Sequence, residues 1–146
     1  MNRFRSIAVL LCATVLSSCE KNAVQDITAP LPTARIKFFN FGVNAPGVNF
    51  YANEVKLTAI SSSTGIESTT GTAAGSVAGG GFYSGIAPGQ YSLSARIAAA
   101  TDKDFSVTKV TTTIADAKFY SFYTSGIYDA TGKSVEGFVV EDPLPP

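Results

Sequence analysis

The sequence predicts an all-β protein, built as an antiparallel immunoglobulin-like β-sandwich of about seven or eight strands. Three observations lead to this fold class. From residue 33 onward, apolar and polar side chains alternate with a period of two in most of the chain, as in half-buried strands. No segment shows a helical period over the window of about eleven residues that such a test requires. Glycine, proline and asparagine separate the alternating stretches at fairly regular spacing, as turns do.

The first half of the sandwich contains three predicted strands. The first begins at Thr33 and the second spans 48–52, and every second side chain of each is apolar. Asn53-Glu54 is expected to form a tight turn into a partner strand at 55–60, because asparagine tolerates positive φ. The stretch 61–81 is rich in Ser, Thr, Gly and Ala, which predicts a long loop or weakly patterned edge strands.

The second half begins with a turn at Ala87-Pro88-Gly89-Gln90, where Pro and Gly occupy the two central positions of a type II turn. The strand that follows, 91–97, has the clearest alternation in the chain. The stretch 105–114 is rich in β-branched residues, which favours a strand. Its apolar phase slips between Val107 and Val110, which predicts a β-bulge.

Two more strands complete the predicted sandwich. An aromatic strand at 119–128 turns at 129–132 into a last strand at 135–140. Asp116 lies four residues before Tyr120, a spacing that resembles a tyrosine corner. The expected core consists of the apolar residues on one face of these strands: Ile36, Phe38, Val48, Phe50, Leu57, Tyr91, Leu93, Ile97, Val110, Ile114, Phe122 and Val139.

The N-terminal segment has the features of an export signal. Arg3 and Arg5 precede an apolar stretch at 7–16, which is shorter than the roughly 20 residues of a membrane-spanning helix. A short buried helix is the alternative for this stretch. It ends in Leu16-Ser17-Ser18-Cys19, which resembles the lipobox of bacterial lipoproteins and implies lipid attachment at Cys19. Glu20 differs from the Asp-type signal for retention in the inner membrane, which favours the outer membrane, facing the periplasm or the cell surface.

Composition sets limits on partners and on disulfides. Removal of residues 1–18 would leave 9 basic against 11 acidic residues, a net charge of −2 that does not favour nucleic acid as a partner. The two cysteines, Cys12 and Cys19, leave no disulfide within the processed chain. The predicted parts of the chain are a lipoprotein signal peptide (1–18), a flexible tether (19–32), a β-sandwich (33–141) and a proline-rich tail (142–146).

Three segments of the sandwich resemble the DUF4397 family. Residues 40–51 have a strand ending in Asn, a loop with Ala-Pro, and a strand with an aromatic residue. Residues 83–93 and 118–123 resemble the second and third signatures of the family. Asn49 stands where members usually have Asp. The resemblance covers 33–142, and it implies a β-sandwich and a cell-envelope location but no established activity.

The residue types argue against catalysis. The chain has no histidine and no cysteine after Cys19, which removes the commonest general base, the usual zinc ligands and the thiol nucleophile. Asp102-Lys103-Asp104 could be half of a calcium site, but an exposed turn is favoured because calcium takes about six or more oxygens. Gly79-Gly80-Gly81 precedes a strand and not the helix that phosphate-binding loops use. We therefore expect no enzyme activity, no metal and no cofactor.

Tyrosines supply the candidate binding surface. Seven aromatic residues cannot all lie inside if their strand neighbours do, so some are expected on a sheet face or at loop tips: Tyr51, Tyr83, Tyr120, Tyr123, Tyr128, Phe39 and Phe119. The possible binding surface is Tyr51, Tyr83, Tyr123 and Tyr128. There, flat rings can stack on a sugar or anchor a protein partner. The alternative is that they fill a large core, lie under the loop 61–81, or cover a second sandwich layer. Three functions stay open: adhesion or assembly through a protein partner, glycan binding at the cell surface, and service as an accessory domain of an envelope enzyme.

Overall fold

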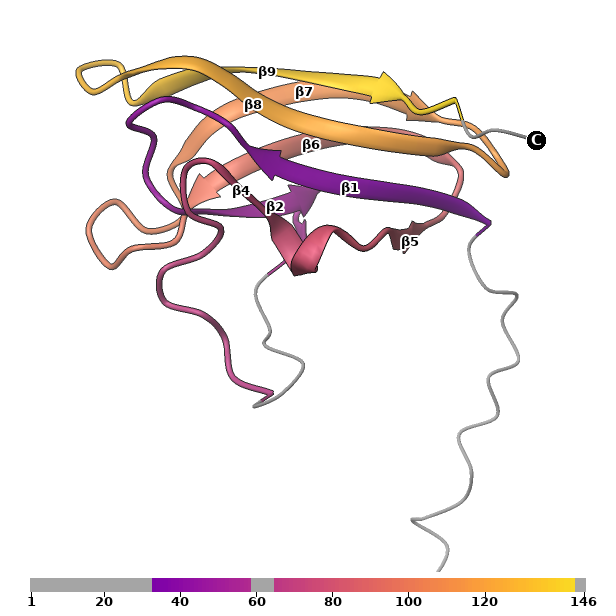
Figure 1. Ribbon diagram of the computed structural model, residues 1–146, viewed down its shortest axis with the longest axis horizontal. Helices are drawn as coiled ribbons and strands as arrows, with labels where there is room; N and C mark the ends of the chain where they lie inside the picture. The colour runs from indigo at the N-terminus through magenta and orange to yellow at the C-terminus, as the bar shows by residue number, and fades with distance from the viewer. Residues whose placement is uncertain (1–32, 59–64, 144–146) are drawn as a thin grey trace, which may run out of the picture. The chain divides into compact units, whose positions relative to one another are not determined.

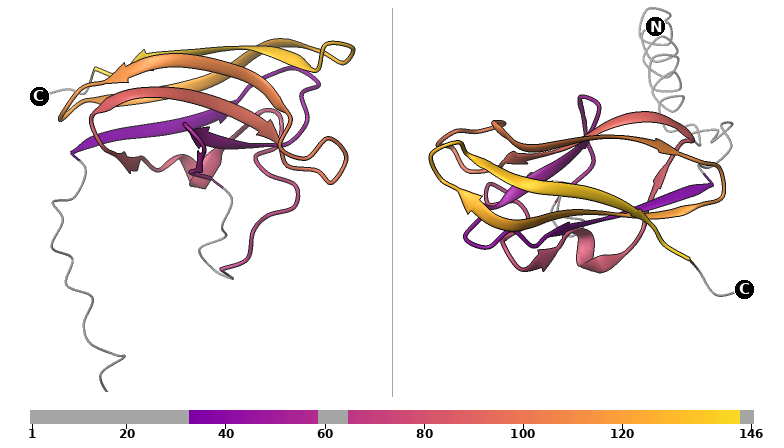
Figure 2. Two further views of the ribbon diagram at one scale, coloured as in Figure 1. Left: turned by 180° about the vertical axis from the view of Figure 1, so that it is seen from behind. Right: turned by 90° about the horizontal axis from the view of Figure 1, so that it is seen from above.

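The computed structural model describes residues 33–58 and 65–143, which form two packed β-sheets (Figures 1 and 2). The all-β sandwich predicted from the sequence is confirmed. The predicted signal peptide, Cys19 and the tether lie outside the described residues, as does the end of the tail. The described elements are β1 (Ala34–Asn40), β2 (Val48–Ala52), β3 (Val55–Lys56), β4 (Ser76–Val77), the 3-10 helix η2 (Ala78–Gly81), β5 (Ser84–Ile86), β6 (Gly89–Ile97), β7 (Ser106–Ile114), β8 (Phe119–Asp129) and β9 (Ser134–Glu141).

The two sheets are assembled from distant parts of the chain. The first sheet has the strand order β4-β1-β8-β9, and β5 pairs with β1 beside β4. The second sheet has the order β3-β2-β6-β7. Nine strands are described, where the sequence pattern predicts about seven or eight. The additional ones are the two-residue strand β4, in the Gly-rich stretch 61–81, and the three-residue strand β5. Strands so short leave no alternation in the sequence.

Strands β1 and β8 pair in parallel, which corrects the purely antiparallel arrangement predicted from the sequence. The other pairs of named strands are antiparallel. The parallel register runs from Arg35 opposite Phe119 to Asn40 opposite Thr124, and it continues in the bridge between Val43 and Ile127. Alternation shows which face of a strand is buried but carries no information about strand direction, so the pattern could not predict this pair.

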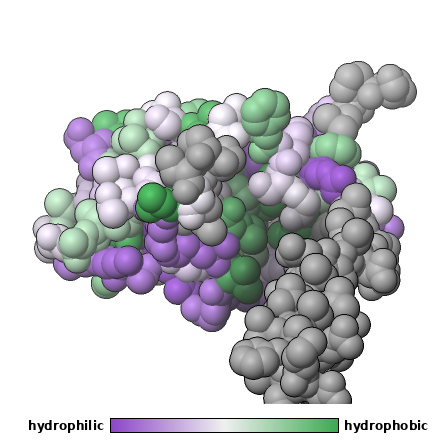
Figure 3. Space-filling view, turned by 90° about the horizontal axis from the view of Figure 1, so that it is seen from below, coloured by the Kyte–Doolittle hydropathy of each residue, from purple (hydrophilic) through white to green (hydrophobic). Residues whose placement is uncertain are grey.

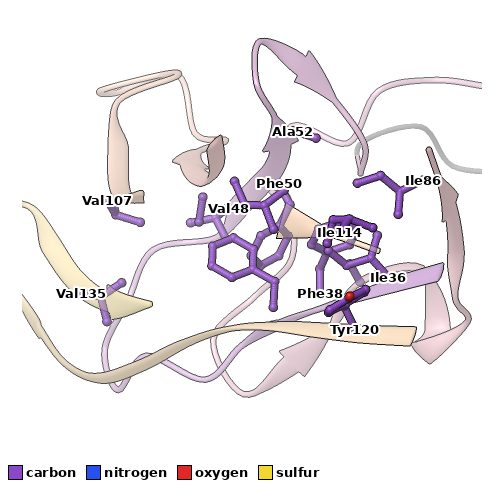
Figure 4. Close-up of a cluster of buried hydrophobic side chains, with 14 of the residues drawn as sticks. Ile36, Phe38, Val48, Phe50, Ala52, Ile86, Val107, Ile114, Tyr120 and Val135 are labelled. Carbon is purple, nitrogen blue, oxygen red and sulfur yellow. The ribbon is translucent and has the colours of Figure 1, made fainter. Parts of the chain in front are cut away.

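Aromatic side chains form the centre of the core (Figure 4). The rings of Phe38 and Phe50, from opposite sheets, stack with centroids 5.1 Å apart, and Phe122 meets both rings edge-on. Of the residues predicted for the core, eight are buried. The other four pack against the core while only partly buried: Leu57, Tyr91, Val110 and Val139.

Strand β2 is buried on both faces, although its alternation predicts a half-buried strand. Phe50 faces the core, while Asn49 and Tyr51 on the opposite face are only 2% and 5% exposed. The guanidinium of Arg96 on β6 lies 4.3 Å from the Tyr51 ring and helps to cover it. The sequence of β2 alone could not predict this burial, because the side chain that covers its polar face comes from another strand.

Two local predictions are confirmed. The register of β7 shifts beside Arg96, where Val107 is the extra residue of a bulge and turns into the core. The hydroxyl of Tyr120 accepts a hydrogen bond of 3.0 Å from the backbone N–H of Ala115, as in a tyrosine corner. This bond fixes the connection between β7 and β8, and Ala115, not Asp116, is the partner of the tyrosine.

Candidate functional site

The outer face of the first sheet is built by the odd-numbered residues of β1 and β8. On β1, Ala34, Ile36 and Phe38 are buried, so Arg35, Lys37 and Phe39 point away from the core. Directly paired residues point to the same side of a sheet. The outer face therefore also includes Phe119, Ser121 and Tyr123 of β8, and Phe138 and Val140 of β9.

Three aromatic rings form a row across this face. Phe39 pairs with Tyr123, and Tyr123 pairs with Phe138, so the three rings lie at one level of the sheet. The Phe39 and Tyr123 ring centroids are 4.6 Å apart at an interplanar angle of 12°. Those of Tyr123 and Phe138 are 5.2 Å apart at 22°. These separations match the spacing of about 4.8 Å between strands, so the rings stand on the sheet, face against face.

Apolar side chains extend the row beyond the end of β1. Phe41 contacts Phe39 and Tyr123, with centroids 5.3 Å and 6.0 Å apart, and is 46% exposed. Val43 and Ile127 continue the parallel register of β1 and β8 and are 56% and 79% exposed. We call this surface the aromatic face, and define it as Phe39, Phe41, Val43, Tyr123, Ile127, Phe138 and Val140.

The other end of the same sheet carries a polar cluster around Tyr83. The ammonium of Lys37 lies 3.9 Å from the centroid of the Tyr83 ring, a cation–π contact. Asp142 accepts hydrogen bonds from the hydroxyls of Tyr83, at 2.9 Å, and Ser121, at 2.7 Å. Burial raises the pKa of Tyr83 to about 12, and the hydrogen bond to the Asp142 carboxylate adds to the shift. This end of the sheet is therefore held together by polar contacts.

The structure places two of the four predicted tyrosines on the outer side of the first sheet, at different ends. Tyr123 lies in the aromatic row, and Tyr83 lies at the polar end of the same sheet. Tyr128 is half-buried and packs against the core, as the alternative prediction has it. The prediction that Tyr51 belongs to an exposed surface is wrong, because this residue is buried in the second sheet. The predicted lipid attachment site, Cys19, lies outside the described residues.

The buried side chain of Tyr51 is held by polar and charged neighbours within the fold. Its hydroxyl donates a hydrogen bond of 2.7 Å to the carboxylate of Asp104, and cations of Arg96 and Lys56 lie over its ring. Burial is the largest cause of its raised pKa, and the hydrogen bond to Asp104 is the next. Asp104 and its neighbour Asp102, which pairs with Lys133, are thus occupied within the fold, as expected of a turn.

Phe41 and Phe138 are members of the face that the tyrosine pattern does not predict. A signal for them exists in the sequence, because Phe39 and Phe41 continue the phase of Arg35 and Lys37, which is the solvent phase of the strand. An aromatic residue in that phase indicates an exposed ring. The parallel register then gathers these rings with those of β8, and that step is not visible in the sequence.

The described residues also contain a groove of about 740 Å³, lined in part by Phe38, Leu57, Ala78 and Phe82. It lies on the side shown in Figure 3, where apolar surface is visible in a hollow. The ion pair between Lys56 and Glu67 contributes to its wall. We place no site there, because the lining includes Thr58, which borders the undescribed segment 59–64.

Within the described ranges, no cluster of three or more His, Cys, Asp or Glu side chains is arranged to hold a metal ion. The helices in that part of the chain include none long and apolar enough to cross a membrane. No family model, curated protein or solved structure matches the chain. The resemblance to the DUF4397 family and the lipobox therefore stay predictions from the sequence.

Proposed function

We propose that the chain is a lipid-anchored cell-envelope protein whose non-catalytic β-sandwich binds a protein partner through the aromatic face. The observation that carries this proposal is the exposure of Phe41, Phe138 and Ile127, at 46%, 45% and 79%, on one side of a single sheet. Phe41 and Phe138 both contact the Tyr123 ring. Contiguous apolar surface rimmed by polar groups is typical of protein interaction sites. Phenylalanine and tyrosine are also enriched at the centres of such sites.

The ring geometry favours a protein over a glycan as the ligand. A sugar stacks on the open face of an aromatic ring. In the aromatic row, the faces of Tyr123 are covered by Phe39 at 4.6 Å and Phe138 at 5.2 Å. The central ring of the row therefore presents its edge to solvent, and only the end ring Phe138, on the edge strand β9, keeps an open face. Ring edges pack well against aliphatic and aromatic side chains. An envelope enzyme served by this domain is one such protein partner.

The position of the face also suits a tethered domain. The predicted tether joins the sandwich at Thr33, next to the first residue of β1. The most exposed residues of the aromatic face, Val43 and Ile127, lie past the opposite end of that strand. A domain held at Thr33 would present them away from its attachment, at a distance of about 30 Å for nine residues of extended chain.

The partner is tested by photo-crosslinking in intact cells that carry the full chain. A photoreactive residue at position 41 or 127 is expected to give a discrete adduct with another protein. Position 55, on the second sheet, is the matched control because Val55 is 65% exposed. Adducts of equal yield from position 55, or none from position 41, would overturn the proposal. An adduct with the mass of two identical chains would not count in its favour.

The anchor is tested separately with Cys19→Ala. The wild-type chain is expected to incorporate labelled fatty acid and to fractionate with membranes, since two acyl chains hold a protein firmly and one does not. The variant is expected to accumulate as an unprocessed precursor without label. Cys12→Ala is the control, because Cys12 lies within the predicted signal peptide and is removed with it. Equal labelling of Cys19→Ala and wild type would reject the anchor.

A further inference from the structure

Strand β9 is a long sheet edge whose central part lacks protection against pairing with another strand. Sheet edges are protected where strands are very short or carry proline or charged side chains, lysine above all. The charges of β9 are Glu136 and Glu141, and the residues between them are uncharged. Among the described strands, β3, β4 and β5 have two or three residues each, and β7 carries the exposed Lys109. Strand β9 has 8 residues, no lysine or proline, and the exposed Phe138 and Val140.

The hydrogen bonds of β9 show which backbone groups face its free edge. The N–H of Asp142 donates to the carbonyl of Phe119 at 2.7 Å. Bonded residues alternate along an antiparallel pair, so Glu136, Phe138 and Val140 bond to β8. The residues whose N–H and C=O groups point to the free edge are Val135, Gly137, Val139 and Glu141.

The two sheets approach each other closely beside this edge, but β7 of the second sheet does not pair with β9. Val139 on β9 and Val110 on β7 pack against the core, yet both are only partly buried. A Cβ atom on Gly137 would lie 2.6 Å from Oγ1 of Thr108, so β7 passes beneath β9 and does not pair with it. In the view from above, β9 (yellow) crosses the picture in front of the other strands, so its edge of the sandwich faces the viewer (Figure 2, right). A second strand therefore has access to the edge.

We propose that β9 pairs with β9 of a second copy of this chain, antiparallel, about a two-fold axis at Phe138. Residues directly opposite then include Phe138 with Phe138, Glu136 with Val140, and Val135 with Glu141. Four edge-facing residues per strand can exchange about eight backbone hydrogen bonds. Identical surfaces meet in such a contact, as in most homodimers.

The register is selected by the rings and the charges. With the axis at Phe138, the two Phe138 rings lie opposite one another and the aromatic row continues into the second copy. With the axis at Val139, Glu136 would oppose Asp142, and like charges directly opposite are destabilising. With the axis at Gly137, Glu136 would oppose Phe138 and interrupt the stack of rings. The inference needs neither the lipid anchor nor a partner on the aromatic face.

The register is tested by disulfide formation in the full chain, expressed in cells and treated with mild oxidant. Position 138 forms a non-hydrogen-bonded pair with itself, and the Cα atoms of such a pair are about 4.5 Å apart, within disulfide range. The Phe138→Cys chain is therefore expected to shift to the two-chain band on a non-reducing gel. Phe41→Cys is the matched control, because Phe41 and Phe138 are 46% and 45% exposed and both touch Tyr123.

Wild type is the second control, since it reports any crosslinking through the native Cys12 and Cys19. The proposal is overturned if Phe138→Cys gives no more of the two-chain band than these controls. It is equally overturned if a mixture of Glu136→Cys and Phe138→Cys chains crosslinks while Phe138→Cys alone does not, because that places the axis at Gly137.

A charge pair separates loss of pairing from loss of folding. Phe138→Lys places two ammonium groups opposite one another, so sedimentation of the purified full chain is expected to shift from two copies to one. Phe138→Glu is expected to do the same. Co-expressed, the two variants are expected to sediment as a pair again. A wild-type chain that sediments as a single copy, or a mixture that stays single, overturns the proposal.

Discussion

The hydroxyl of Thr124 donates a buried hydrogen bond of 2.8 Å to the side-chain oxygen of Asn40, and both residues are fully buried. The side-chain nitrogen of Asn40 donates to the carbonyl oxygens of Pro46, at 3.0 Å, and Thr72, at 2.8 Å. One amide thus joins β1, β8 and two loops. Buried polar groups that are fully satisfied in this way fix the packing of the chain around them.

We expect Thr124→Val to lower the free energy of unfolding by about 1–3 kcal/mol, because it leaves the Asn40 oxygen buried without a donor. Thr111→Val on β7 is the matched control. Thr111 is exposed, so its change should lie within about 0.5 kcal/mol of zero. Urea unfolding monitored by circular dichroism measures both values. Equal effects of the two substitutions would contradict the role given to Asn40.

The tyrosine corner provides a second prediction. Tyr120→Phe leaves the N–H of Ala115 without its partner and should cost about 1–2 kcal/mol of stability. Tyr91→Phe removes a hydrogen bond of 3.0 Å to the carbonyl of Ala87, which is exposed to water. Water can replace that bond, so the control should cost less than about 0.5 kcal/mol. A larger loss for Tyr91→Phe than for Tyr120→Phe, measured by urea unfolding, would refute the ranking.

Two glycines with left-handed backbones differ only in their surroundings. Gly71 has φ of +63° and Gly75 has φ of +77°. Gly75→Ala should cost about 1–2 kcal/mol from the backbone alone, since nothing lies within 4 Å of the new Cβ. Gly71→Ala should cost a further 1–3 kcal/mol or so, because its Cβ would lie 2.7 Å from both the Val48 carbonyl oxygen and the Ala98 methyl. Thermal unfolding that ranks the two variants equally would contradict this packing.

Tyr83 should make stability depend on alkaline pH. Its pKa of about 12 in the folded chain exceeds the value of about 10 for an unfolded tyrosine, so folding favours the protonated ring. The contribution is complete below pH of about 10 and is lost as the pH rises toward 12. Ultraviolet titration of the folded chain should show a late tyrosinate step.

Two variants test whether the late tyrosinate step belongs to Tyr83. Tyr83→Phe should remove the step near pH 12, and Asp142→Asn should move it to lower pH, because the carboxylate that disfavours tyrosinate is gone. Ser121, which also donates to Asp142, offers the control variant Ser121→Ala, in which the step should persist. A step that persists unchanged in Tyr83→Phe would show that another tyrosine is responsible.

Much of the fold could be predicted because alternation reports burial directly. Ile36, Phe38 and Phe122 are buried as the period of two predicts, and the phase slip beside Val107 marks a bulge. Strand direction could not be predicted, since β1 and β8 carry no local signal for parallel pairing. The weakly patterned stretch before β5 likewise conceals β4.

The candidate site could be predicted only in part, because it depends on pairing between distant strands. Tyr123 was predictable as an exposed aromatic, but its stack with Phe39 and Phe138 requires the order β1-β8-β9. The prediction that Tyr51 is exposed was wrong because a distant residue covers it. Alternation places Tyr51 on the polar face of its strand, but the Arg96 side chain, distant in the sequence, lies over the ring.

The pairing of β1 with β8 also sets the order in which the chain can fold. Each residue of β1 meets a partner 84 positions later, as Asn40 meets Thr124. Contacts of such high sequence separation slow folding, because the entropy of closing the long loop is lost before the contacts form. A growing chain that ends before Phe119 has no partner for that edge of β1, so the first sheet closes only after the chain has been synthesised through β8.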